Sequence, residues 1–258
     1  MPLAQRLKVV ASVFPLAEVA RRVGLGRVTV TDLVPPGGDP RAAAPSGDVF
    51  DGAVVLTAGR GYQPAVDAAA AAGNGSAKPL VVVAVWDKVG GDQSNIWLDP
   101  TTMMRITTLV ADVLSATDPA GRAAYQSGAR AYGAQLGALD IDYRRSLADC
   151  ARRDVVAADG AFTPLASRYG FVDHAVGESG ILRLVQSRGV PTIFTEPLIP
   201  PGPAVALAQA ARVKVDTLST LETRSLEEAA RGATYLSIMT DNLDKLRRAL
   251  ACTSGAGA

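Results

Sequence analysis

The stretch Ser94-Asn95-Ile96-Trp97-Leu98-Asp99-Pro100 carries the clearest local signal in the sequence. Asp99 can accept hydrogen bonds from the first free N–H groups of a helix, and Pro100 suits the first helical position because no N–H is needed there. The three apolar residues before Asp99 therefore predict a buried anchor directly in front of a helix. Asn95 is presented at the edge of whatever cleft lies above this anchor.

The composition is that of an ordered globular protein. The 258 residues can bury one large core or two moderate ones, and 48% of them are hydrophobic. The 26 basic and 25 acidic residues give a net charge of +1, and no basic stripe is visible, so nucleic acid and anionic membranes are poor candidate partners. The longest apolar run, residues 80–86, has the length of a strand rather than of a membrane span.

The two cysteines, Cys150 and Cys252, are not at a metal-ligand spacing. In an exported protein they would be candidates for a disulfide, and in the cytosol they would be two unrelated thiols. The single histidine, His174, is interpreted as a structural or surface residue rather than a ligand or a base.

Strand and helix patterns alternate along both halves of the chain, which predicts the α/β class with mainly parallel sheets. Between the halves, residues 118–150 keep apolar side chains three and four positions apart, which predicts one helix about 50 Å long. Because a small domain does not need such a helix, we interpret it as a rigid connector. We expect an N-terminal lobe over residues 1–117, a linking helix over 118–152, a C-terminal lobe over 153–258 and a cleft between the lobes.

Several short stretches form an ordered series along the chain. They are Val10–Leu16, Leu33–Gly37, Ala58–Gly59 with Gln63–Pro64, Ile96–Pro100, Asp118–Pro119, Gly160–Phe162 with Arg168–Gly170, Ile193–Pro197, and Tyr235–Leu236 to Asn242–Leu243. Each stretch alone is weakly specific, but their order and spacing resemble the metal-binding solute-binding proteins of zinc and manganese ABC importers over nearly the whole chain. The resemblance implies one metal ion between the lobes, no catalytic residues and an ABC permease as partner.

The resemblance also implies four metal ligands, and this sequence departs from that set. The place of the first histidine, after the Pro-Pro-Gly loop, is held by Arg41, and that of the second, before the anchor, by Asn95. The third ligand, a histidine or a glutamate in the family, is Asp159. The fourth, an aspartate after the last strand, aligns best with Ser219, with Asp216 three residues away. Zinc prefers imidazole or thiolate and manganese accepts carboxylates with some imidazole, so Asp159, the one ligand type that is kept, is not expected to hold either ion tightly.

An arginine at this place has a consequence of its own. A guanidinium is permanently cationic and only donates hydrogen bonds, so it repels a divalent ion instead of binding it. We therefore expect Arg41 to replace the cation by bridging to Asp159 across the cleft, with Asn95 and Ser219 as neutral neighbours. The alternative is that Arg41 points to solvent and the cleft is merely eroded.

Four further residues belong to the expected cleft region. Arg60 and Tyr62 are candidates for its rim, and Glu196 is expected near it, ordering a loop rather than binding ligand. Gln63 stands where the family usually has glutamate, which removes a negative charge near the site.

The sequence thus predicts an extracytoplasmic solute-binding protein of a metal-type ABC importer, not an enzyme, with a degenerate metal site. It is expected in the periplasm or at the cell surface as a monomer, with any leader or lipid anchor upstream of Met1. No cofactor is expected; zinc or manganese is left as a low-affinity ligand, and a small polar or anionic solute is the other candidate. Two alternatives stay open: weak divalent-metal capture for import, and a non-transport scaffold or interaction module on the same fold.

Overall fold

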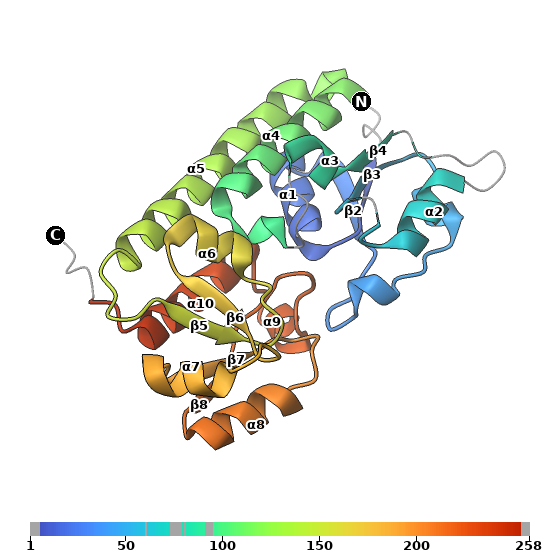
Figure 1. The fold of residues 1–258 in the computed structure, drawn as a ribbon. Helices are drawn as coiled ribbons and strands as arrows, with labels where there is room; N and C mark the ends of the chain where they lie inside the picture. Colours follow the sequence, from blue (N-terminus) through green and yellow to red (C-terminus); the bar gives the residue numbers. More distant parts are fainter. Residues whose placement is uncertain (1–5, 60, 73–78, 80, 91–94, 254–258) are drawn as a thin grey trace.

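The computed structural model describes residues 6–59, 61–72, 79, 81–90 and 95–253. They form two α/β lobes joined by a long helix (Figure 1), which confirms the predicted fold class. The sheet of the N-terminal lobe has four parallel strands in the order β2-β1-β3-β4, and that of the C-terminal lobe repeats the pattern as β6-β5-β7-β8. The strands are β1 Leu7–Ala11, β2 Val28–Asp32, β3 Ala53–Thr57, β4 Val81–Ala84, β5 Asp154–Ala157, β6 Val172–Ala175, β7 Thr192–Thr195 and β8 Lys214–Thr217.

Helices cover both faces of each sheet, so the central strands are buried on both sides and read as continuous apolar runs. All five residues of β3 are buried, in line with its AVVLT sequence. The α-helices are α1 Phe14–Gly24, α2 Pro64–Ala72, α3 Val85–Val89, α4 Pro100–Thr117, α5 Arg122–Ser146, α6 Thr163–Tyr169, α7 Ile181–Arg188, α8 Gly202–Ala211, α9 Leu226–Ala230 and α10 Tyr235–Leu250, with 3₁₀ turns η1 Pro40–Ala42, η2 Gly47–Phe50, η3 Ile96–Leu98 and η4 Pro119–Gly121.

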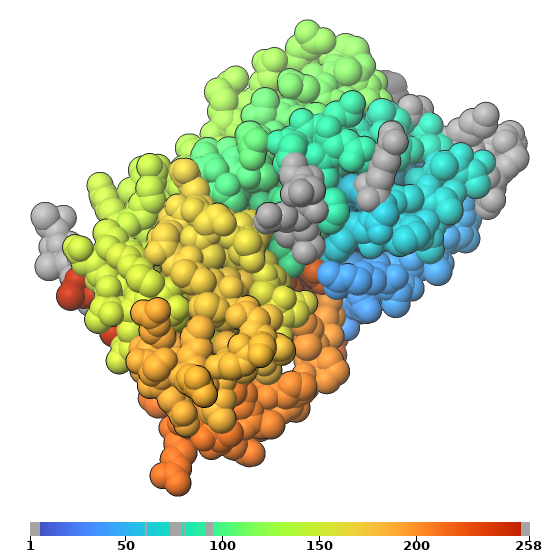
Figure 2. All heavy atoms as spheres, in the orientation of Figure 1, coloured from blue at the N-terminus to red at the C-terminus, as the bar shows by residue number. Residues whose placement is uncertain are grey.

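The two lobes share one hydrophobic core. A single cluster of buried side chains runs from Val9 of β1 through Leu136 of α5 to Val155 of β5 and Leu246 of α10. The space-filling view shows the lobes packed directly against each other beside α5 (Figure 2). The apolar burial that stabilises each lobe therefore also fixes one lobe against the other.

The linking helix is shorter than predicted at both ends. It begins at Arg122, because Asp118 and Pro119 open a separate 3₁₀ turn and the Asp118 carboxylate accepts hydrogen bonds from Arg27 and from the Tyr125 hydroxyl. It ends at Ser146, and the following residues turn so that Cys150 reaches the C-terminal segment. With 25 residues, α5 is about 37 Å long rather than 50 Å.

Two elements of the C-terminal lobe differ from the sequence pattern. The apolar and polar pattern of residues 225–250 predicts one helical region, but they form two helices, α9 and α10, each begun by a capping box. The turn between them contains Gly232, whose φ is +67°. Strand β6 was not predicted because its central residues, Asp173 and His174, are charged or polar. Both side chains are partnered inside the lobe, by Phe162 for Asp173 and by Asp154 and Glu178 for His174.

The anchor before α4 joins the lobes. Asp99 accepts a hydrogen bond from the Thr101 N–H and caps α4, as its position predicts. The Trp97 ring is buried, its Nε1–H donates to the Thr220 carbonyl at 2.8 Å, and its own carbonyl accepts from the Tyr235 hydroxyl at 2.6 Å. This one residue of the N-terminal lobe is thus bonded to two segments of the C-terminal lobe.

None of the helices in the described residues has the length and apolar character needed to cross a bilayer.

In the structure Cys150 and Cys252 form a disulfide across 102 positions of sequence. Changing both to serine is expected to lower the free energy of unfolding by about 2–5 kcal/mol, because the bond restricts the unfolded chain. Urea unfolding of the oxidised wild type, the reduced wild type and the double variant measures this. Equal stability of all three proteins would contradict the disulfide.

Candidate functional site

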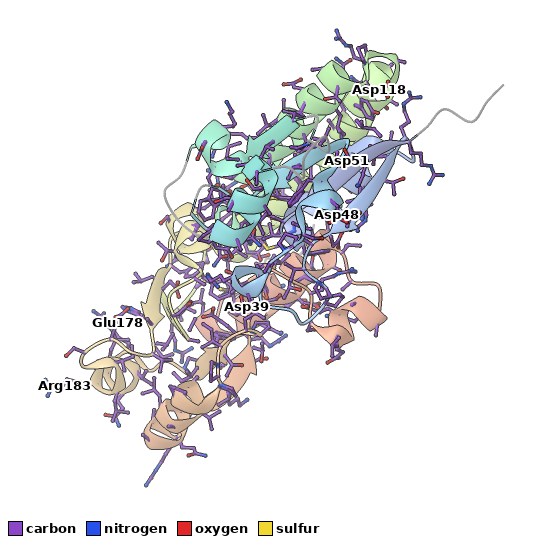
Figure 3. All side chains as sticks on the ribbon, turned by 90° about the vertical axis from the view of Figure 1, so that its right-hand side faces the viewer. Asp39, Asp48, Asp51, Asp118, Glu178 and Arg183 are labelled. Atoms are coloured by element: carbon purple, nitrogen blue, oxygen red, sulfur yellow. A yellow bond between two sulfur atoms is a disulfide. The ribbon has the colours of Figure 1, made fainter. Side chains whose placement is uncertain are left out.

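A cavity of about 50 Å³ lies where the two lobes meet, at the carboxyl ends of their strands. Asp39 and Arg41 reach it from the segment after β2, and Asp159, Glu196 and Glu222 reach it after β5, β7 and β8. Figure 3 shows Asp39 at the boundary between the lobes. The full lining is Asp39, Arg41, Asn95, Asp159, Ala161, Glu196, Leu198, Ile199, Thr220 and Glu222.

The backbone around Arg41 is held from two sides. The Asp39 carboxylate accepts a hydrogen bond from the Arg41 N–H at 2.8 Å and caps the turn η1. The buried Gln63 side chain donates from Nε2 to the Pro40 carbonyl at 2.8 Å and to the Ser12 carbonyl at 3.1 Å. Gln63 therefore positions the loop that carries Arg41.

The Arg41 guanidinium bridges the cleft, but its partner is Glu222. Nη1 donates to Oε2 at 3.2 Å and Nη2 to Oε1 at 3.1 Å, the paired geometry that suits a guanidinium and a carboxylate. The guanidinium also lies 5.1 Å from the centre of the Tyr62 ring, a cation–π contact. Among the described residues Arg41 makes no hydrogen bond or ion pair with Asp159, so the predicted partner was wrong.

Glu222 is the residue that the sequence alignment missed. Its backbone carbonyl accepts a hydrogen bond from the Phe14 N–H at 3.2 Å, which holds it against the N-terminal lobe, and the residue is only 3% exposed. A turn through Leu221, whose φ is +58°, brings it into the cavity. The sequence held one indication of this residue: Glu222 is an acidic residue three positions after Ser219, the residue that aligned with the fourth ligand of the family.

Ser219 and Asp216 do not line the cavity. The Ser219 N–H and C=O are both bonded to the Asn242 side chain, at 3.0 and 2.8 Å, so Ser219 ties the loop to α10. Asp216 lies on β8, where its carboxylate accepts from the Thr217 N–H. The place expected for Ser219 is taken by Thr220 and Glu222.

Asn95 faces the cavity without a partner. It is 2% exposed, and its backbone has a φ of +63°, a left-handed conformation that asparagine tolerates better than most residues. Its Oδ1 is buried and accepts no hydrogen bond from any described residue. Buried acceptors are nearly always paired in folded proteins, so this oxygen is a position where a donor is missing.

The floor of the cavity in the C-terminal lobe is acidic. Glu196, 4% exposed, accepts a hydrogen bond from the Asp159 N–H at 3.1 Å, so it orders that loop as well as lining the cavity. Burial raises the pKa of Glu196 to about 8, and the charge of Asp159 adds to the effect. Burial likewise raises the pKa of neighbouring Asp173 to about 6. The raised pKa favours the protonated form of Glu196 at neutral pH.

Tyr62 lies beneath the Arg41 guanidinium rather than at the rim. Its ring makes edge contacts with Trp86 at 5.0 Å and with Trp97 at 5.9 Å, and its buried hydroxyl has no hydrogen-bond partner among the described residues. Burial raises the pKa of Tyr62 well above its usual value. Arg60, the other expected rim residue, lies outside the described residues.

The lining contains no histidine or cysteine among the described residues, and its Glu222 is already paired with Arg41. Zinc prefers imidazole or thiolate ligands, and manganese accepts carboxylates with some imidazole. Across the described part of the chain, no three His, Cys, Asp or Glu side chains are arranged to hold a metal ion. The lone histidine, His174, lies elsewhere, with Glu178 on one ring nitrogen and Asp154 on the other.

Two α/β lobes, a joining helix and a cleft at the strand ends define a solute-binding protein. The sequence matches the family described as zinc-uptake complex component A, periplasmic (ZnuA), over residues 9–249, and the chain belongs to this family. Its members are substrate-binding proteins of ABC importers and not enzymes. Family membership confirms the resemblance drawn from the sequence.

Three relatives illustrate the match. The zinc-binding lipoprotein AdcA of Streptococcus pneumoniae is 29% identical over 166 residues, which are 60% of this chain and 33% of AdcA. The high-affinity zinc uptake system protein ZnuA of Bacillus subtilis is 26% identical over 60% of this chain and 53% of its own length. The match thus spans about a third to a half of these relatives. The manganese ABC transporter substrate-binding lipoprotein PsaA of Streptococcus anginosus is 21% identical over 95% of this chain and 90% of its own.

Solved structures show the same fold. The Zn(II)-bound ZnuA-like domain of Streptococcus pneumoniae AdcA superposes with a TM-score of 0.81 at 24% identity, covering 95% of this chain and 99% of that domain. The laminin-binding protein Lmb of Streptococcus agalactiae superposes with a TM-score of 0.83 at 23% identity, covering 95% and 100%.

Replacing Arg41 by alanine is expected to lower the free energy of unfolding by about 1–3 kcal/mol, because the buried Glu222 carboxylate loses its paired donor. The Arg41 side chain is half exposed, which favours the lower end of this range. Urea unfolding measures the loss. The double variant Arg41→Ala/Glu222→Gln should recover part of it, and wild-type stability in Arg41→Ala alone would show that the pair contributes nothing.

The raised pKa of Glu196 leads to a prediction for the pH dependence of the free energy of unfolding. Between its usual value of 4.5 and its raised pKa of about 8, the unfolded state releases this proton while the folded state keeps it. The stability of the wild type should therefore fall as pH rises through this window. The Glu196→Gln variant has no carboxyl group at this position, so its free energy of unfolding should not show this decline. The difference in stability between the variant and the wild type should therefore grow as pH rises and then level off. Parallel stability curves for the two proteins would refute the assignment.

Proposed function

We propose that this protein is the extracytoplasmic solute-binding component of an ABC importer of the metal-uptake class and that its high-affinity zinc or manganese site has been lost. Family membership and the two-lobe fold support the importer role. The periplasm or cell surface would be its location, an ABC permease its partner, and a monomer its working form.

The Arg41–Glu222 pair is the observation that carries the loss of the metal site. A fixed positive charge lies in the cleft and occupies one of its buried carboxylates through two hydrogen bonds. A divalent ion brought beside this guanidinium would meet both charge repulsion and a reduced number of free ligands. The bridge links the two lobes as a shared metal ion would, because Arg41 of the N-terminal lobe neutralises Glu222 of the C-terminal lobe.

The ligand set can be rebuilt to test this proposal. In Arg41→His/Asn95→His, two imidazoles would join Asp159 and Glu222, a nitrogen and oxygen set that zinc accepts. Histidine is among the residues that tolerate the left-handed backbone of position 95. Calorimetric titration of chelator-treated proteins should show no micromolar binding of zinc or manganese to wild type and a gain of about 100-fold or more in zinc affinity in the variant.

Arg41→Gln/Asn95→Gln is the matched control, since it removes the guanidinium without supplying imidazole. It should stay close to wild type in zinc affinity. Micromolar or tighter binding of zinc or manganese by the wild type would sink the lost-site proposal and favour retained metal capture.

A further inference from the structure

The cleft contains acceptors that lack donors. The Asn95 Oδ1, on a residue 98% buried, lines the cavity without a partner. Asp159 lines the same cavity, and no described lysine, arginine or histidine forms an ion pair with its carboxylate. The buried Asn95 acceptor has no described donor, and the lining also holds the exposed carboxylates of Asp39 and Asp159, the latter bonded to the Glu196 side chain. This combination favours a ligand that donates hydrogen bonds and carries positive charge.

The charges of the lining disfavour an anion. Arg41 is the one cationic side chain of the lining, and both of its terminal nitrogens are occupied by Glu222. Asp39 and Asp159 form no ion pair with a cationic side chain among the described residues. An anionic solute would meet this acidic surface, where the charge of Arg41 is already balanced by Glu222.

The size of the cavity limits the ligand to a small group. Its volume of about 50 Å³ compares with the roughly 10–15 Å³ of such space that one water molecule needs, so it admits a group of a few heavy atoms. A primary ammonium group has three N–H donors and one positive charge in a volume close to that of water. The apolar part of the wall, formed by Ala161, Leu198 and Ile199, suits a short alkyl chain attached to such a group.

We propose that the cleft binds a small primary ammonium cation, either ammonium itself or a short alkylamine, through the Asn95 Oδ1 and the Asp159 carboxylate. This inference rests on the proposed role as a solute-binding component and names the class of its solute. A single charge and directional N–H donors match what the cleft offers, whereas a divalent metal needs several free ligands that it does not offer.

The binding test uses the full chain in an amine-free buffer at constant ionic strength. Ammonium chloride and methylammonium chloride are titrated, with tetramethylammonium chloride and sodium chloride as controls that carry the same charge without an N–H donor. The side-chain amide signals of Asn95 are followed by NMR, and affinity is measured by calorimetry. We expect saturable shifts of the Asn95 amide with one or both N–H cations and none with the two controls; the two N–H arms decide between free ammonium and an alkylamine.

Two variants test the named ligands. Asn95→Gly removes the amide and keeps a backbone that tolerates positive φ, and Asp159→Asn removes the charge. Each is expected to weaken binding by about tenfold, the loss of one charge-assisted hydrogen bond. Asp51→Asn is the matched control, because Asp51 is exposed and lies farther from the lobe boundary than Asp39 (Figure 3); its affinity should equal that of wild type.

Three results would overturn the proposal. Equal shifts with tetramethylammonium or sodium would mean a general ionic effect, and no saturable shift with any cation would mean that the cavity holds water only. Equal loss of affinity in Asp51→Asn would place the binding elsewhere. Tight zinc binding by wild type would defeat the proposed loss of the metal site, whereas absence of both zinc and amine binding would defeat this inference and leave that loss standing.

Discussion

The buried carboxylate of Glu222 imposes the constraint on which the closed arrangement of the lobes depends. A carboxylate that is 3% exposed must be neutralised by a nearby cation or by protonation. In this chain the cation is supplied from the other lobe by Arg41, through two hydrogen bonds. The loop of Arg41 is in turn fixed by Asp39 and by Gln63, so the guanidinium is positioned before it meets its partner.

The neutralised carboxylate is part of a larger seam between the lobes. Trp97 is bonded to Thr220 and to Tyr235, and the hydrophobic core continues through α5 from one sheet to the other. The Arg41–Glu222 pair adds a charge-neutral link at the cleft. The lobes are therefore held together by the protein's own side chains. Asn95, Asp159 and Glu196 are polar cleft residues that remain to contact a solute.

Much of this could be predicted from the sequence, for physical reasons. Asp99-Pro100 encodes its helix start locally, and the apolar runs of the central strands are buried on both faces, so both were predictable. The cleft residues Arg41, Asn95 and Asp159 were named from the family resemblance, and the structure places all three in the lining of the cavity. Strand β6 was not predictable, because its charged or polar central residues break the apolar pattern, and their partners Phe162 and Asp154 lie 11 and 20 positions away in sequence.

The sequence predicted Asp159 as the partner of Arg41, and Glu222 was missed because its position depends on the turn that follows Ser219. In this turn the Phe14 N–H donates to the Glu222 carbonyl, and the Asn242 side chain holds Ser219. The central claim, that Arg41 has taken the place of a metal ion, is tested most directly by the melting temperature of the wild type with a chelator and with excess zinc. We expect the same melting temperature in both conditions, because a ligand stabilises only the state it binds. A rise of several degrees with zinc, reversed by the chelator, would contradict the claim.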